Sequence, residues 1–201
     1  MKKIMMLFIA ATVIATTAFT VSNILPIGST LPKADLKMMD VSGKLVSMKD
    51  VIKEKGVMVM FSCNTCPYVV KNQKRTLNIS NFAQKMGFGV IVLNSNEAQR
   101  GDDDSFNEMK SYAKQQGYSW NYVVDKNNEV ADAFGANRTP ECFLFDKNLK
   151  LVYHGAIDDN PSDEGAVKQQ HLRNAIELTA AGKEVVIKET RSVGCSIKRS
   201  K

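Results

Sequence analysis

Two continuous apolar runs constrain the fold of this chain more than any other feature of its sequence. They are GVMVMFS at residues 56–62 and FGVIVLNSN at residues 88–96, and each has the length of a strand. Runs without polar alternation are typical of strands that are buried on both faces of a sheet. Between them, Pro67 suits the first turn of a helix that extends to Gly87, because its missing N–H has no helical partner there. The sequence therefore predicts a strand–helix–strand unit.

The elements on either side of this unit extend it into a layered α/β fold. A hairpin is predicted over residues 35–51, with Ser42 and Gly43 at its turn. Further strands are predicted over residues 121–125, 141–146 and 150–155, and further helices over residues 100–117, 129–136 and 163–182. In the first of these helices, Ser105 and Glu108 resemble a capping box. We expect a central mixed sheet with helices on both faces and an N-terminal hairpin extension.

The two ends of the chain differ from this layered region. Residues 1–20 begin with MKK and continue as an uncharged apolar run, which predicts a secretory signal peptide. The run is also near the length that spans a bilayer, so an uncleaved anchor is left open, and only then would the protein contact a membrane. Either way, we expect an exported, periplasmic protein. Residues 24–184 are predicted to form the domain, and residues 185–201, with few apolar side chains, a C-terminal tail.

The charge of the chain gives little support to nucleic-acid binding. Lysine and arginine number 27 against 21 acidic residues, for a net charge of +6; loss of Lys2 and Lys3 by cleavage leaves 25 against 21, or +4. The basic residues are spread along the chain and do not form a stripe with interleaved aromatic residues.

The segment CNTCP places Cys63 and Cys66 between the first buried strand and the helix. A helix N-terminus has unpaired N–H groups and a dipole that favour an anion. We therefore predict that the pKa of Cys63 lies below ~8.5, toward the ~3.5–7.5 of thiols so placed. Cys66, one turn inside, is predicted to be more buried and to resolve a mixed disulfide.

Zinc binding and a structural bridge are weaker interpretations of this pair. A structural zinc site needs two more ligands, and Cys142, Cys195, His154 and His171 are all isolated in the sequence. A Cys63–Cys66 bridge that is purely structural closes too small a loop to stabilise the fold through chain entropy. We therefore predict redox chemistry, with no metal and no cofactor.

The segments CNTCP and RTPE together resemble the thioredoxin superfamily. The segments FSCNTCPYV, ADAFGANRTPECFLFD and VGCSIK are similar to its AhpC/TSA-type redoxins, whose pair often reads Cys-Asn-His-Cys-Pro, and the similarity covers residues 28–198. The resemblance implies a thioredoxin-like fold in which Pro67 follows the cysteine pair. It also implies a cis Thr139–Pro140 bond that faces the pair and leaves backbone groups available to a bound disulfide partner.

The chain departs from this family at two positions. Thr65 replaces the histidine of many relatives, so an imidazolium that would stabilise a thiolate is missing, and we expect a thioredoxin-like reductant. Ser62 replaces the usual tryptophan. The proline and threonine of peroxiredoxins fall seven and three positions before the peroxidatic cysteine, and neither is present when counted back from Cys63 or from Cys66.

The other candidate residues have less specific patterns. Cys142 alternates with Leu144 in a strand and is predicted to be buried and inert. Cys195 is a possible third redox cysteine, a pairing site for a partner, or the partner of Cys142. The segment GDDDS at residues 101–105 is interpreted as helix capping by its acidic residues, and residues 157–161 as a loop that could border the site.

These observations predict an exported thiol–disulfide oxidoreductase in which Cys63 attacks a partner disulfide and Cys66 resolves the mixed disulfide that forms. Its partners would be protein thiols and disulfides and an upstream reductant. Two alternatives stay open: a thiol-dependent peroxidase, and a redox-inactive thioredoxin-fold binding module.

Overall fold

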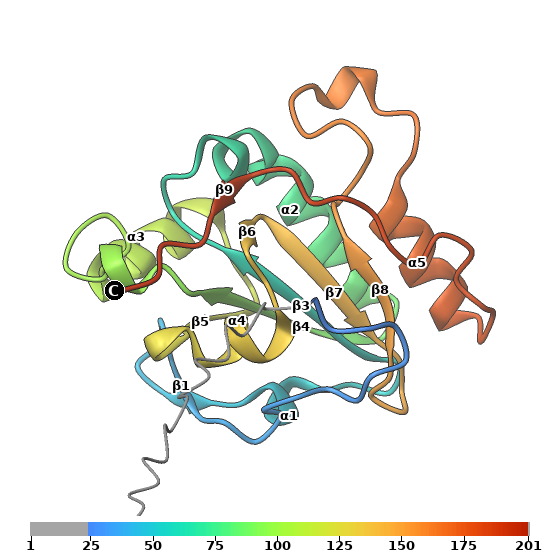
Figure 1. The fold of residues 1–201 in the computed structure, drawn as a ribbon, viewed down its shortest axis with the longest axis horizontal. Helices are drawn as coiled ribbons and strands as arrows, with labels where there is room; N and C mark the ends of the chain where they lie inside the picture. The colour runs from blue at the N-terminus through green and yellow to red at the C-terminus, as the bar shows by residue number, and fades with distance from the viewer. Residues whose placement is uncertain (1–23, 201) are drawn as a thin grey trace, which may run out of the picture.

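A seven-stranded mixed sheet forms the centre of residues 24–200, the part of the chain that the computed structural model describes (Figure 1). The strands are β1 (Met38–Asp40), β2 (Leu45–Val46), β3 (Gly56–Ser62), β4 (Phe88–Asn94), β5 (Asn121–Val124), β7 (Glu141–Phe145) and β8 (Leu151–Gly155), with β6 (Arg138–Thr139) and β9 (Cys195–Ser196) as a separate pair. The helices are α1 (Met48–Val51), α2 (Pro67–Lys85), α3 (Phe106–Gln116), α4 (Glu129–Phe134) and α5 (His171–Ala180), with short 3₁₀ turns η1 (Glu97–Gln99), η2 (Lys126–Asn128) and η3 (Glu164–Ala166). The predicted α/β fold is confirmed.

The strand order in the sheet is β2-β1-β5-β4-β3-β7-β8. Strands β3, β4 and β5 are parallel, whereas β7, β8 and β1 run antiparallel to their neighbours. β3, α2 and β4 form the predicted strand–helix–strand unit, and β1 and β2 form the predicted hairpin. Because parallel strands end at one edge, Ser62 of β3 lies beside Asn94 of β4, and the segments that follow both strands meet there.

Alternate residues of β3 face opposite layers of the fold. Met58 and Met60 belong to the core cluster that includes buried side chains of α2, α3 and α5. Val57, Val59 and Phe61 belong to the cluster that includes α1 and α4. Every residue of β3 is buried, as a strand covered on both faces requires.

The ends of α3 follow from its capping residues. The Ser105 hydroxyl accepts a hydrogen bond from the Glu108 amide at 3.3 Å, so the helix begins at Phe106 and not at residue 100. Gly117 has a φ of 67° and ends the helix in the left-handed region that glycine adopts at little cost.

The predicted helix over residues 163–182 is wrong at its start, because α5 begins at His171. The preceding residues form a loop whose polar side chains bond their own backbone: Asp163 accepts from the Gly165 amide, and Asp159 from the Lys168 amide. Such local bonds compete with helix formation.

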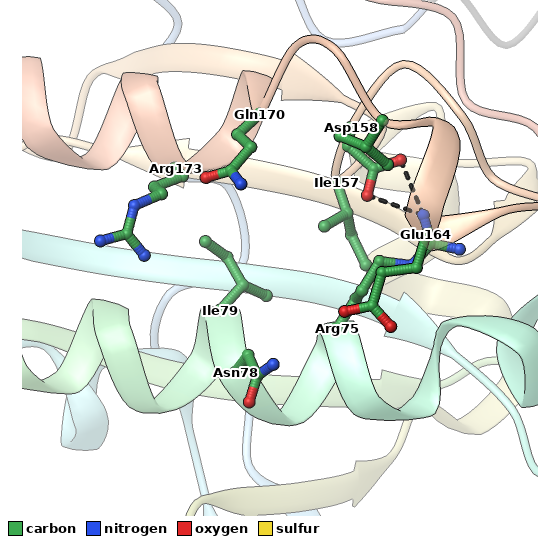
Figure 2. Close-up of a pocket in the computed structure, with 9 residues that line it drawn as sticks. Arg75, Asn78, Ile79, Ile157, Asp158, Glu164, Gln170 and Arg173 are labelled. Carbon is green, nitrogen blue, oxygen red and sulfur yellow. Dashed lines mark hydrogen bonds and ion pairs between the residues drawn. The ribbon is translucent and has the colours of Figure 1, made fainter.

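Arg75 of α2 ties this loop to the body of the fold. Its guanidinium donates to both carboxylate oxygens of Asp158, at 2.8 and 2.7 Å, and to the carbonyls of Asn160 and Pro161. Figure 2 shows the pair at one end of a cavity of about 300 Å³ between α2 and the loop. The cavity is lined by Arg75, Asn78, Ile79, Ile157, Asp158, Glu164, Val167, Gln170 and Arg173, so the 157–161 loop borders this cavity and α2.

The segment predicted as a C-terminal tail is packed against the domain. Val185 and Ile197, two of its few apolar residues, are both buried. The backbone of β8 exchanges hydrogen bonds with residues 188–190, β9 pairs with β6, and the Ala98 amide donates to the Lys198 carbonyl. We call residues 188–199 the C-terminal strap.

The predicted signal peptide or anchor, residues 1–20, lies outside the described residues. Within residues 24–200, no helix has both the length and the apolar character needed to cross a membrane.

We predict that Arg75→Met destabilises the protein by about 3–5 kcal/mol, because it leaves the Asp158 carboxylate buried without its partner. The double variant Arg75→Met/Asp158→Leu should recover most of that loss. Lys74→Met is the matched control on the next position of α2: the Lys74–Glu164 pair is exposed and 3.5 Å long, so its loss should cost less than about 1 kcal/mol. Urea unfolding measures all three, and equal effects of Arg75→Met and Lys74→Met would contradict the prediction.

Candidate active site

Cys63 lies directly after β3, at the edge of the sheet where the parallel strands end. Its side chain is only 1% exposed. Its Sγ is 3.5 Å from the hydroxyl oxygen of Thr139, which is also buried. The Cys63 thiol is therefore almost completely shielded from solvent.

Cys66 is the N-cap residue of α2, and Pro67 occupies the first position of the helix, as predicted. Its thiol donates to the carbonyl oxygen of Thr139 at 3.3 Å, and its side chain is 5% exposed. The prediction that Cys66 is more buried than Cys63 is therefore wrong: Cys66 begins the helix, whereas Cys63 precedes it by three residues and lies over the end of β3.

Thr139 contacts both cysteines. The Thr139–Pro140 peptide bond is cis, as the family resemblance implied. The hydroxyl of Thr139 contacts Cys63 and its carbonyl contacts Cys66. The structure thus brings together Cys63, Cys66, Pro67, Thr139 and Pro140.

Hydrogen bonding and burial separate the pKa values of the two thiols. The neighbouring Cys63 thiol is the main cause that lowers the pKa of Cys66 to about 4, and together with the nearby Cys195 and Val69 it outweighs the opposite effect of burial. The pKa of Cys63 is raised well above its usual range, first because its proton is held in the bond to Cys66, then by burial, with repulsion from Asp104 adding to both. The predicted low pKa of Cys63 is therefore wrong, because its interaction with Cys66 and its burial both raise that pKa.

A buried carboxylate, Asp104, holds the loop between the cysteines. Its side chain accepts hydrogen bonds from the Asn64 amide at 2.9 Å, from Asn94 at 2.7 Å and from Asn96 at 2.8 Å. The Tyr122 hydroxyl donates to the Asn64 side chain at 2.9 Å. Asp104 is completely buried. Its position therefore fixes where the loop leaves β3.

This role of Asp104 was not predicted from the sequence. The segment 101–105 was predicted to cap a helix, but Ser105 caps α3, and the Asp104 carboxylate accepts a hydrogen bond from the Asn64 amide at the site. The signal in the sequence was the amide side chains at the ends of the two predicted buried strands, Asn64 just after the first and Asn94 and Asn96 at the end of the second, because buried amides need hydrogen-bond partners.

The remaining cysteines have different surroundings. Cys142 is fully buried in β7, and burial raises the pKa of its thiol, which agrees with the prediction of an inert residue. Cys195 lies in β9, where it pairs with Thr139, and it packs against the core cluster that contains Cys63 and Cys66. The structure therefore places Cys195 at the site.

Among the described residues, no group of three or more histidine, cysteine and acidic side chains is arranged to hold a metal ion. His154 lies in β8, where its ring nitrogen is 3.2 Å from the buried carboxylate of Glu141. His171 begins α5. The cavity of Figure 2 is lined by none of the four cysteines.

Comparison with known proteins places this geometry in a family. The Redoxin family profile matches residues 26–171. The chain belongs to the Redoxin family. The resemblance to AhpC/TSA-type redoxins of the thioredoxin superfamily is thereby confirmed.

Individual relatives agree with this membership. The thiol-disulfide oxidoreductase ResA of Geobacillus thermodenitrificans (strain NG80-2) is 26% identical over 133 residues, which are 66% of this chain and 71% of that protein. An uncharacterized conserved protein from Geobacillus kaustophilus has a TM-score of 0.82 and 34% identity, over 89% of this chain and 94% of its own. A hypothetical protein SMc02350 from Sinorhizobium meliloti 1021 has a TM-score of 0.80 and 30% identity, over 89% and 97%. Family and relatives support thiol–disulfide oxidoreductase activity for this redoxin.

We predict that ultraviolet thiolate absorbance of the reduced redoxin shows one thiolate that is present above pH 4 and is lost as the pH falls through about 4, the pKa of Cys66. Cys66→Ser should remove this step. Cys63→Ser should keep it, and Cys142→Ala is the control that leaves it unchanged. A step that survives in Cys66→Ser but disappears in Cys63→Ser would reverse the assignment.

Proposed function

We propose that this redoxin exchanges a dithiol for a disulfide with partner proteins through Cys63 and Cys66. The observation that carries the proposal is the contact of both sulfur atoms with Thr139, at 3.5 and 3.3 Å, which holds two thiols side by side at a helix N-terminus. A lowered thiol pKa beside a protonated partner thiol is what exchange chemistry needs, since the thiolate is the nucleophile.

The proposed reaction has two steps. The Cys66 thiolate attacks one sulfur of a partner disulfide, forms a mixed disulfide and releases the partner's other sulfur as a thiolate. The Cys63 thiol then attacks the sulfur of Cys66, which releases the first partner sulfur, and the proton of Cys63 passes to a released thiolate. Two electrons move from the Cys63–Cys66 dithiol to the partner, and an upstream reductant must then reduce the enzyme. The order of attack is the reverse of the one that the sequence suggested.

The proposed direction is reduction of the partner. Thr65 provides no imidazolium between the cysteines, and the raised pKa of Cys63 disfavours its thiolate, both of which favour a reducing pair. The lowered pKa of Cys66 acts the other way, because it stabilises the reduced form. We propose that the first two effects outweigh the third, so that the pair acts as a reductant.

We predict that the protein accelerates reduction of insulin disulfides by dithiothreitol. Cys66→Ser and Cys63→Ser should each return the rate to its uncatalysed value, because one sulfur attacks and the other completes the exchange. Cys142→Ala is the matched control and should retain the activity, since this cysteine lies in β7 and the hydrogen bonds of Thr139 with thiols are those with Cys63 and Cys66.

Three outcomes would contradict the proposed function. Full activity in both active-site variants would show that the sulfurs are not used. No activity in the wild-type protein would favour a binding module. Consumption of peroxide by the wild type that is lost in Cys66→Ser, without insulin reduction, would favour a peroxidase.

We also propose that the protein works outside the cytoplasm. The support is the charged start, apolar run and small residues of positions 1–20. Fusion of residues 1–40 to alkaline phosphatase, which is active only after export, should give an active reporter. Replacement of three apolar residues of the run by aspartate should abolish that activity, and an active fusion after this replacement would contradict the proposal.

A further inference from the structure

The C-terminal strap occupies the pairing edge next to the active site. β9 pairs antiparallel with β6, with Arg138 opposite Ser196 and Thr139 opposite Cys195. Figure 1 shows the strap in red, returning from α5 to lie beside β6. The backbone groups that the family resemblance left available for a partner are therefore bonded to the chain itself.

Both ends of the strap are anchored. Before β9, the His154 amide donates to the Lys188 carbonyl at 2.9 Å, and the Thr190 amide donates to the His154 carbonyl at 3.0 Å. After β9, the Ile197 amide donates to the Asn137 carbonyl at 3.1 Å. These bonds fix the position of Cys195 along β6.

Gly194 allows the strap to come this close. A Cβ atom at this position would lie 2.0 Å from the Thr139 carbonyl oxygen, which is the atom that accepts the hydrogen bond of Cys66. Any larger residue would push the strap away from Thr139. The close approach of the strap is therefore built into the sequence one position before Cys195.

The three cysteines around Thr139 differ in exposure. Cys63 is 1% and Cys66 is 5% exposed, whereas Cys195 is partly exposed. Cys195 lies opposite Thr139, whose carbonyl oxygen is 3.3 Å from the sulfur of Cys66, and it packs against the core cluster that contains Cys66. A partner that approaches the folded protein therefore meets Cys195 before it meets either residue of the pair.

We propose that Cys195 is a third redox residue that exchanges with Cys66, so that the disulfide moves between a buried Cys63–Cys66 form and an outward Cys66–Cys195 form. The proposal rests on the proposed function, since it needs an oxidised Cys63–Cys66 pair. It gives the strap the role of an internal partner in the place that an external peptide would otherwise take.

The exchange is balanced within the protein. The sulfur of Cys195 attacks the sulfur of Cys66, the Cys66–Cys195 bond forms, and the Cys63–Cys66 bond breaks. Cys63 leaves as a thiolate and takes up the proton that Cys195 gives up, so no external oxidant or reductant is consumed. An external dithiol then reduces the outward disulfide without reaching Cys63.

The test maps disulfides in single variants of the full chain after oxidation by oxidised glutathione, with alkylation in acid and peptide mass spectrometry. Cys63→Ser should form an intramolecular Cys66–Cys195 disulfide, and Cys195→Ser should form Cys63–Cys66. Cys66→Ser should form neither, because Cys66 is shared by both. In the wild type, both disulfides should be found.

Gly194→Ala separates the strap from the cysteines without changing any sulfur. In the Cys63→Ser background it should lower the fraction of Cys66–Cys195 about tenfold, equivalent to about 1.4 kcal/mol. Gly101→Ala is the matched control, because a Cβ there meets no atom within 4 Å, and it should leave the fraction unchanged.

The results distinguish the two proposals. If Cys63→Ser forms only glutathione adducts or intermolecular dimers while Cys195→Ser forms Cys63–Cys66, the exchange is wrong and the proposed function stands. If Cys195→Ser forms no Cys63–Cys66 disulfide, the proposed function fails. If Gly194→Ala does not fold, the mapping of Cys63→Ser decides alone.

Discussion

The active site depends on the contacts that Thr139 makes with two sulfur atoms. Its hydroxyl oxygen lies 3.5 Å from the sulfur of Cys63 and its carbonyl oxygen 3.3 Å from the sulfur of Cys66, so one residue contacts both although it lies more than seventy residues away in the sequence. Thr139 is itself fixed from three sides: by the cis bond to Pro140, by the start of β7, and by the strap that pairs with β6. The sheet, the strap and the helix N-terminus therefore all act on the chemistry through this residue.

The electrostatics of the site come from unequal surroundings of two identical side chains. Cys66 occupies the N-cap position of α2, and the neighbouring Cys63 thiol lowers its pKa, whereas the pKa of Cys63 is raised by Cys66, by burial and by the buried Asp104 carboxylate. A pair in which one thiol is ionised and the other protonated has both a nucleophile and a group that can complete the exchange. The same carboxylate accepts a hydrogen bond from the Asn64 amide and so positions the loop between the cysteines. Asp104 therefore affects both the geometry of this loop and the pKa of Cys63.

Local sequence patterns were sufficient to predict the layered fold and the position of the cysteine pair between β3 and α2. Continuous apolar runs predicted β3 and β4, and the position of Pro67 predicted the start of α2, because both signals act over a few neighbouring residues. The role of Asp104, the N-cap position of Cys66 and the docking of the strap were missed or misassigned. Each depends on contacts between segments far apart in the chain, such as Thr139 with Cys195. The periodicity of neighbouring residues cannot predict such contacts.

The central claim is that Cys66 is the shared sulfur of the active site, and a redox titration of the wild-type protein in glutathione buffers tests it most directly. Mass mapping of each cysteine across the titration should find Cys66 in every intramolecular disulfide and Cys142 always as a free thiol. For a reductant, the midpoint should lie nearer thioredoxin's ~−270 mV than the ~−120 mV of a strong disulfide donor. A protein in which Cys66 remains a free thiol while other cysteines are oxidised would contradict the account.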